Sequence, residues 1–149
     1  MVENVSTMTL TAQEKANLLD QVDLFAGLGG ISLEAIAGHA IEVEFAPGHP
    51  IVRQGEVGAG FFLVVSGAAR VIRDGDEIAR LGPGEFFGEL ALLDRQPRIA
   101  TVAADGPTTC LAIASWEFEQ LLDEQPRLAL GILRAVVRRL RAMSEPPRH

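Results

Sequence analysis

A carboxylate and an arginine stand nine residues apart, separated by a short apolar run and a polar loop. Glu89 follows Gly88 at the expected start of one helical turn, where free backbone N–H groups favour an anion. Arg98, between Pro97 and an expected strand, can place its guanidinium on the same anion, and Glu89 can accept hydrogen bonds from vicinal hydroxyls. The two side chains therefore suit a sugar ring that bears a phosphate. The same spacing also allows Glu89 and Arg98 to pair with each other.

The other reactive side chains form no recognisable site in the sequence. His39, His49 and His149 are far apart, and none has a cysteine or a carboxylate at metal-ligand spacing. The G-x-S-x-G, P-loop and CxxC motifs are absent. Cys110 lies in an apolar run, which favours a buried core thiol over a nucleophile. We therefore expect no enzyme, no metal and no cofactor. The alternative of a jelly-roll metalloenzyme is disfavoured, because it would need histidines clustered on its strands.

Composition and charge narrow the function classes further. The 149 residues carry 13 basic and 20 acidic side chains, a net charge of −7, so nucleic acid is a poor partner. No apolar run approaches the roughly 18 to 20 residues of a membrane span, and the first residues lack the basic start and apolar run of a signal peptide. With a single cysteine, the chain is expected in the cytoplasm.

Short β-type runs, separated by glycines, are expected to position Glu89 and Arg98. These strands are expected at 41–45, 51–53, 61–66, 69–73, 77–81, 100–104 and 109–114. Asp74-Gly75 predicts a type I′ hairpin turn, because both residues tolerate the positive φ angles it needs. The even spacing of the expected strands predicts an antiparallel sandwich or barrel.

Helices flank the strands at both ends. Thr11 and Glu14 form a capping box for a helix that runs to about Val22, and a short helix follows at 31–38. Ser115 is predicted to cap a helix at 116–123, and Pro126 to begin another that runs to about residue 143. The order of elements predicts one α+β domain at 11–143, with a flexible N-terminus at 1–10 and a tail at 144–149.

The segment that carries the pair also resembles a known family. Its residues 87–102, Phe-Gly-Glu-Leu-Ala-Leu-Leu-Asp-Arg-Gln-Pro-Arg-Ile-Ala-Thr-Val, resemble the phosphate-binding cassette of cyclic nucleotide-binding domains. Such domains occur in catabolite activators, in regulatory subunits of cAMP-dependent protein kinase and in nucleotide-gated channels. The glycine-punctuated run at 51–67 is similar as well, and the resemblance covers about residues 20–143. It implies an antiparallel β-roll (a double-stranded jelly roll) flanked by N-terminal helices and a C-terminal helical pair.

The resemblance implies a role for each matching position. Glu89 would bind the ribose 2′-hydroxyl, with Gly88 allowing close backbone approach, and Arg98 would bind the cyclic phosphate. The remaining positions would be backbone N–H groups for the phosphate (Leu90, Ala91, Ile99 and Ala100), walls of the base pocket (Val64, Val71, Phe86 and Leu90) and lid residues on the last helix (Arg139 and Met143). The alternative for the lid residues is a solvated arginine and a core or interface methionine.

Ile99 stands where cGMP-selective members tend to carry a hydroxyl that can bond the guanine amine. We therefore expect a receptor that prefers cAMP to cGMP, that has no room for a helix-turn-helix after its last helix, and that signals to an unknown effector protein through movement of that helix. The alternative is a ligand-independent interaction or dimerisation module with a vestigial pocket.

A heptad-like stripe on the last helix bears on both interpretations. It consists of Leu133, Val136, Leu140 and Met143. The stripe either packs on the β core or forms the seam of a homodimer.

Overall fold

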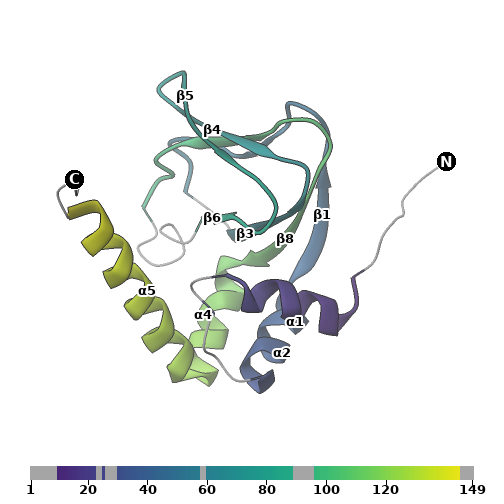
Figure 1. The fold of residues 1–149 in the computed structure, drawn as a ribbon, viewed down its shortest axis with the longest axis vertical. Coiled ribbons are helices and arrows are strands. Elements are labelled where there is room, and N and C mark those ends of the chain that lie inside the picture. Colours follow the sequence, from purple (N-terminus) through teal and green to yellow (C-terminus); the bar gives the residue numbers. More distant parts are fainter. Residues whose placement is uncertain (1–9, 23–24, 26–29, 58–59, 89–95, 145–149) are drawn as a thin grey trace, which may run out of the picture.

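In the part of the chain that the structure describes, eight short strands, most of them ending at or near a glycine, form the centre of the molecule. The computed structural model describes residues 10–22, 25, 30–57, 60–88 and 96–144. The strands are β1 (Ile41–Phe45), β2 (Pro50–Val52), β3 (Gly60–Ser66), β4 (Ala69–Arg73), β5 (Asp76–Leu81), β6 (Phe86–Phe87), β7 (Thr101–Ala104) and β8 (Thr108–Ala114). They pair antiparallel in two four-stranded sheets, ordered β1-β8-β3-β6 and β2-β7-β4-β5. The predicted α+β β-roll is confirmed (Figure 1).

Local sequence signals explain several strand ends. Asp74 and Gly75 have φ angles of 52° and 87°, as the predicted hairpin turn between β4 and β5 requires. The sequence did not predict β6, because Phe86 and Phe87 were expected to lead directly into a helical turn. Their backbone instead extends one sheet, because Phe86 and Phe87 pair with Leu63 and Phe62 of β3.

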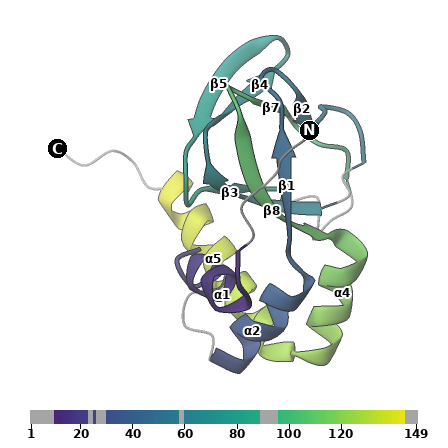
Figure 2. The same cartoon turned by 90° about the vertical axis from the view of Figure 1, so that its right-hand side faces the viewer.

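The helices gather at one end of the roll (Figure 2). They are α1 (Ala12–Asp20), α2 (Gly30–His39), α4 (Ser115–Glu124) and α5 (Pro126–Ser144). The predicted capping box of α1 is confirmed, since Thr11 Oγ1 accepts from the Glu14 backbone N–H at 3.1 Å and Glu14 Oε1 accepts from the Thr11 N–H at 2.9 Å. The predicted cap of α4 is wrong: Ser115 is already helical, and Ala114 at the cap position makes no side-chain cap bond. The reason is that β8 runs directly into α4, so no separate capping residue stands between them.

Two hydrophobic clusters hold these elements together. The larger one fixes the helices to one sheet, and its fully buried members include Leu19, Ile36, Phe61 and Leu121. The smaller one fills the space between the sheets and includes Val64, Val102 and Cys110. Fully burying a side chain of this kind stabilises the fold by about 1.5–3 kcal/mol. Cys110 is a buried core thiol, as predicted, and burial raises its pKa from 9.0 to about 12.

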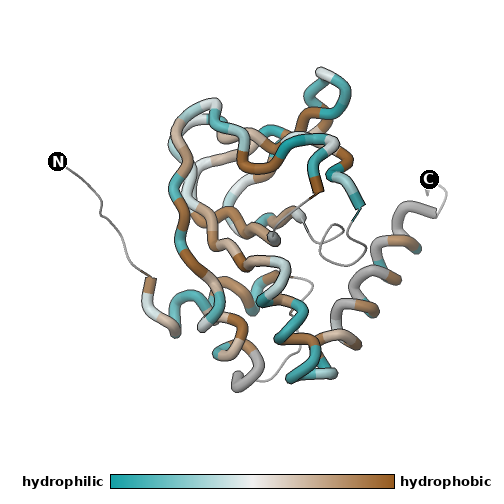
Figure 3. The backbone as a smooth tube through the Cα atoms, turned by 180° about the vertical axis from the view of Figure 1, so that it is seen from behind, coloured by the Kyte–Doolittle hydropathy of each residue, from teal (hydrophilic) through white to brown (hydrophobic). Residues whose placement is uncertain are grey.

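Helix α5 leaves the other helices and runs along one side of the roll (Figure 1), with hydrophobic and hydrophilic residues alternating along it (Figure 3). Leu133 and Leu140 are 59% and 57% exposed, so the interpretation that the stripe packs on the β core is wrong for these two residues. Leu130 and Val137 are exposed as well, while the side chains of Val136 and Met143 lie outside the described residues. The physical reason is that α5 contacts α4 at its beginning and its outer turns extend away from the core. In the described part of the chain, no helix is long and apolar enough to cross a membrane.

Candidate functional site

A cavity of about 270 Å³ lies beside the segment that was predicted to bind a phosphate. Both sheets contribute to its wall, together with the segment before β7. The lining residues are Val52, Val71, Ile78, Leu81, Phe86, Phe87, Gly88, Gln96, Pro97, Arg98, Ile99, Ala100 and Val102. Several predicted site residues are therefore brought together, namely Val71, Phe86, Gly88, Arg98, Ile99 and Ala100.

Arg98 is the buried charge of this cavity. Its residue surface is 7% exposed, and its Nη2 donates to the Gly60 carbonyl oxygen at 2.7 Å. The segment before β3 also bonds the backbone of Arg98. The Arg98 N–H donates to the Glu56 carbonyl oxygen, and the Arg98 carbonyl oxygen accepts from the Gly55 N–H, both at 2.8 Å. The bond to Gly60 holds the guanidinium, and the other two hold the Arg98 backbone in the cavity wall. A side chain that is already held in place loses less conformational entropy on binding.

Gly88 lies directly against the guanidinium. Its φ angle is +95°, a conformation that side-chain-bearing residues rarely adopt. A Cβ at this position would stand 2.5 Å from the Gly60 oxygen and 2.8 Å from Arg98 Nη1. Glycine is therefore required here, both by the backbone conformation and by the close approach to Arg98.

The opposite wall of the cavity is apolar. Val71 of β4 pairs with Val102 of β7, and Val102 pairs with Val52 of β2, so that adjacent strands present their valines to the cavity. Ile78 is the extra residue of a β-bulge, because Val71 faces Ala79 while Ile72 faces Glu77. The bulged Ile78 is 56% exposed and lines the cavity. A wall of this kind accepts a flat apolar ring at one end, while Arg98 offers a cation at the other.

The remaining predicted residues lie elsewhere or beyond the description. Val64 is fully buried between the sheets and is not part of the cavity lining, because its backbone pairs with the turn at Gly84 and Glu85 while its side chain packs in the core. Glu89, Leu90 and Ala91 lie outside the described residues, as does the helical turn expected there.

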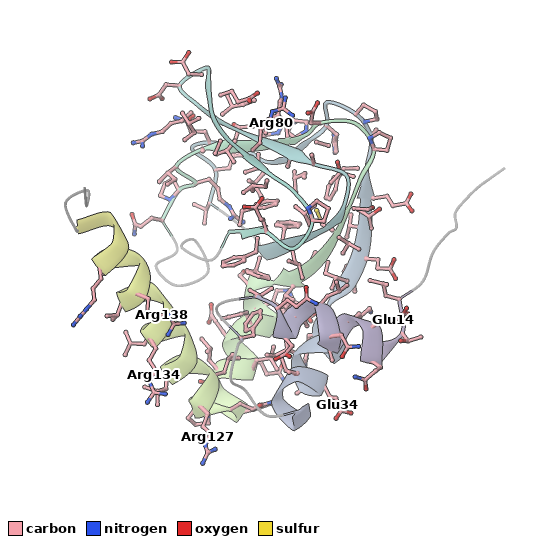
Figure 4. The ribbon with its side chains drawn as sticks, in the orientation of Figure 1. Glu14, Glu34, Arg80, Arg127, Arg134 and Arg138 are labelled. Carbon is pink, nitrogen blue, oxygen red and sulfur yellow. The ribbon has the colours of Figure 1, made fainter. Side chains whose placement is uncertain are left out.

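The two predicted lid residues lie on the backbone of α5. Their side chains, those of Arg139 and Met143, lie outside the described residues. Figure 4 shows the neighbouring Arg134 and Arg138 projecting from the same helix.

Seven lining residues were not predicted as site residues: Val52, Ile78, Leu81, Gln96, and three members of the 87–102 segment to which no role was given, Phe87, Pro97 and Val102. The first three lie in or next to expected strands, but the strand register decides which of their faces meets the cavity. Gln96 precedes the Pro-Arg pair and carried no signal of its own. Among the residues that the structure describes, no three metal-ligating side chains are close enough to hold an ion.

Comparison with known proteins gives an independent view of the chain. Residues 42–125 match the family model of the cyclic nucleotide-binding domain. A cAMP-dependent protein kinase regulatory subunit of Blastocladiella emersonii is 37% identical over 109 residues, which covers 70% of this chain and 27% of that protein. A cGMP-dependent protein kinase of Toxoplasma gondii is 36% identical over 110 residues, covering 74% of this chain and 11% of the kinase. The chain thus spans about a quarter or less of these curated relatives.

Solved structures show the same likeness in three dimensions. The N-terminal domain of a transcriptional regulator from Streptomyces coelicolor A3(2) superposes with a TM-score of 0.76 at 33% identity, over 85% of this chain and 92% of that one. The Thermus thermophilus catabolite activator protein gives 0.72 at 33% identity, over 81% and 59%. The regulatory domain of Toxoplasma gondii PKA, crystallised with cAMP, gives 0.71 at 27% identity, over 84% and 49%.

Proposed function

Since the chain belongs to the cyclic nucleotide-binding domain family, we propose that it is a receptor that binds a cyclic nucleotide in the cavity beside Arg98. The observation that carries this proposal is the buried guanidinium of Arg98, held by Gly60 and packed against Gly88 in the wall of an otherwise apolar cavity. A buried cation gains most from an anionic partner, and a guanidinium fork suits phosphate oxygens. The apolar wall at Val71 and Ile78 would receive the base.

The proposed preference is for cAMP over cGMP. Ile99 lines the cavity and is 61% exposed as a whole residue, so its side chain is available to a ligand. An isoleucine has no group that could bond the exocyclic amine of guanine. One of the relatives described above is a cAMP-dependent protein kinase regulatory subunit and the other is a cGMP-dependent protein kinase, so the likeness to them favours neither nucleotide. The proposal therefore rests on Ile99.

We propose that the receptor works without catalysis, metal or cofactor in the cytoplasm, and that movement of α5 is its output to an effector protein. A row of aromatic contacts supports this output route. Phe86 in the cavity wall lies 5.6 Å from Phe61, which lies 5.6 Å from Phe25, and Phe25 lies 6.4 Å from Phe118 of α4, all between ring centroids. Helix α5 begins two residues after α4 ends. A ligand that shifts Phe86 would thus act on α4 through packed rings, provided that it binds one helix position more tightly than the other.

Calorimetric titration with cAMP and cGMP tests the binding proposal. Arg98→Ala is expected to weaken cAMP binding by about 1.5–3 kcal/mol, roughly tenfold to a hundredfold, for a lost charged hydrogen-bonding partner. Arg70→Ala is a matched control, because Arg70 precedes the cavity residue Val71 and lies on the opposite face of β4, where it pairs with Glu77 at 3.6 Å. Absence of heat and of any thermal shift at millimolar nucleotide would overturn the proposal.

Trp116, the single tryptophan of the sequence, offers a probe of the output route. It lies in the first turn of α4 and is 67% exposed. If the cavity is coupled to α4, saturating cAMP changes the fluorescence of Trp116, and Phe61→Leu reduces that change without abolishing binding. Unchanged fluorescence at saturating nucleotide would contradict this route.

A second candidate is a homodimer or docking module that works through α5. The exposed apolar face at Leu133 and Leu140 favours it, because a helix with such a face gains free energy by covering it. This candidate predicts stable oligomers in sedimentation velocity both with and without cAMP, and the same oligomers for Arg98→Ala. A receptor whose oligomeric state responds to cAMP would rule out the ligand-independent version.

A further inference from the structure

Gln54, which follows β2, makes hydrogen bonds to two separate parts of the roll. Its side-chain Nε2 donates to Asp74 Oδ1 at 2.8 Å, and its Oε1 accepts from the Asp74 backbone N–H at 2.9 Å. Its own backbone N–H donates to Thr101 Oγ1 at 2.9 Å. The first two bonds hold the tip of the β4–β5 hairpin, and the third holds the start of β7. Gln54 therefore joins segments that are 20 and 47 residues away in the sequence.

One side of this connection leads to the buried arginine. Gly55, the next residue, donates its N–H to the Arg98 oxygen, and Glu56 accepts from the Arg98 N–H. Gln54, Gly55 and Glu56 thus form one short segment that bonds the hairpin on one side and the Arg98 backbone on the other. A displacement of this segment would displace Arg98.

The other side leads to the apolar wall. Asp74 occupies the hairpin turn with a φ of 52°, and the bulge at Ile78 follows on β5. In β5, the outer strand of its sheet, Ile78 and Leu81 line the cavity. A two-residue turn fixes the hairpin locally, but β5 has a strand neighbour on one side only, so its position relative to Arg98 needs a further contact. The two bonds from Gln54 supply one.

We infer that Gln54 is a positioning residue, which sets the distance between the Arg98 end of the cavity and the Ile78 wall and thereby the affinity for the nucleotide. This inference rests on the proposed function, because it assumes that a cyclic nucleotide binds between those two ends. Gln54 does not line the cavity, so its effect on the ligand passes through Asp74, Gly55 and Glu56.

A reciprocal exchange of the amide at Gln54 and the carboxylate at Asp74 tests the inference, with cAMP as the probe. Gln54→Glu removes the donor to Asp74 and brings two carboxylates together, so we expect the Kd for cAMP to rise about three- to tenfold. Asp74→Asn keeps the acceptor oxygen and tolerates the positive φ, so its Kd should stay within about twofold of the wild type. In the double variant the amide introduced at position 74 can donate to the carboxylate introduced at position 54. Its Kd is expected to return to within about twofold of that of Asp74→Asn.

The outcomes separate this inference from the proposed function. If the wild type does not bind cAMP, the proposed function fails, and this inference falls with it. If the wild type binds and Gln54→Glu binds equally well, the role of Gln54 alone is overturned. A double variant that stays as weak as Gln54→Glu also overturns it, because a general defect at position 54 would not respond to the exchange. Thermal unfolding of all four proteins accompanies the titrations, since a merely structural role would lower the midpoint and leave the Kd of the folded protein unchanged.

Discussion

Replacing Gly88 by alanine probes the contact between the cavity wall and the buried arginine. The change adds a Cβ at a φ of +95°, which costs about 1–2 kcal/mol for a residue with a side chain. The same Cβ would stand 2.5 Å from the Gly60 oxygen and 2.8 Å from Arg98 Nη1. Relieving that overlap costs a further 1–3 kcal/mol or so. We therefore expect Gly88→Ala to lower the free energy of unfolding by about 2–5 kcal/mol.

The affinity for cAMP should fall as well, because the nearest flexible group is the guanidinium itself. A displaced Arg98 loses a charged hydrogen bond of about 1.5–3 kcal/mol to the phosphate, so the Kd should rise at least about tenfold. Urea unfolding measures the first effect, and calorimetric titration of the folded protein measures the second.

Two other glycines separate the causes. Gly106 has a φ of +86° and nothing within 4 Å of its Cβ position, so Gly106→Ala should carry the conformational cost alone. Gly67 has the same φ, and its Cβ would overlap the Pro107 oxygen away from the cavity, so Gly67→Ala should lose stability and keep its Kd. If Gly88→Ala matches Gly106→Ala in both stability and Kd, the close approach of Gly88 to Arg98 has no energetic weight, and the reasoning is refuted.

Three further predictions concern other parts of the chain. Ile99→Thr supplies a hydroxyl at the cavity and should lower the ratio of cAMP affinity to cGMP affinity by about tenfold, as measured by parallel titrations. An unchanged ratio would show that Ile99 does not determine the nucleotide preference. Burial raises the pKa of the Cys110 thiol to about 12, so a thiol reagent at pH 8 should leave Cys110 unmodified until urea unfolds the protein. The stability that comes from this raised pKa is present below pH 9 and is lost as the pH rises toward 12. Leu133→Asp with Leu140→Asp should leave thermal unfolding of the monomer unchanged, because both side chains are exposed, and should abolish any oligomer seen by sedimentation; a persistent oligomer would exclude this face.

Most of the secondary structure could be predicted because its signals are local. The predicted strands at 41–45 and 69–73 coincide with β1 and β4, since short apolar runs end there at turn residues. The capping box of α1 involves residues three apart in the sequence, and the Asp74-Gly75 turn involves two adjacent ones. Ser115 misled the prediction because the pattern for a cap does not reveal that β8 runs into α4 without a break.

The candidate site could be predicted in part. Arg98 and Gly88 were found because the motif that carries them is contiguous, whereas Ile78, Val52 and Leu81 were missed. Their exposure to the cavity depends on strand register and on the bulge in β5, which neighbouring residues do not encode. Val64 was placed in the wrong layer for the same reason: it is an apolar strand residue, and such a residue fits either the core or a cavity wall.

The β-type runs, the turns between them and the family that the 87–102 segment resembles can all be recognised in the sequence, because each depends on residues close together along the chain. The surroundings of Arg98 cannot, because they depend on how the sheets pack. Its guanidinium reaches the Gly60 carbonyl across 38 residues, and Gln54 reaches Asp74 across 20. Such contacts arise when the two sheets pack, and packing is governed by the summed burial of many side chains rather than by any local pattern. Arg98, which the sequence shows only as an arginine after a proline, is a buried cation in a cavity wall because the roll packs around it.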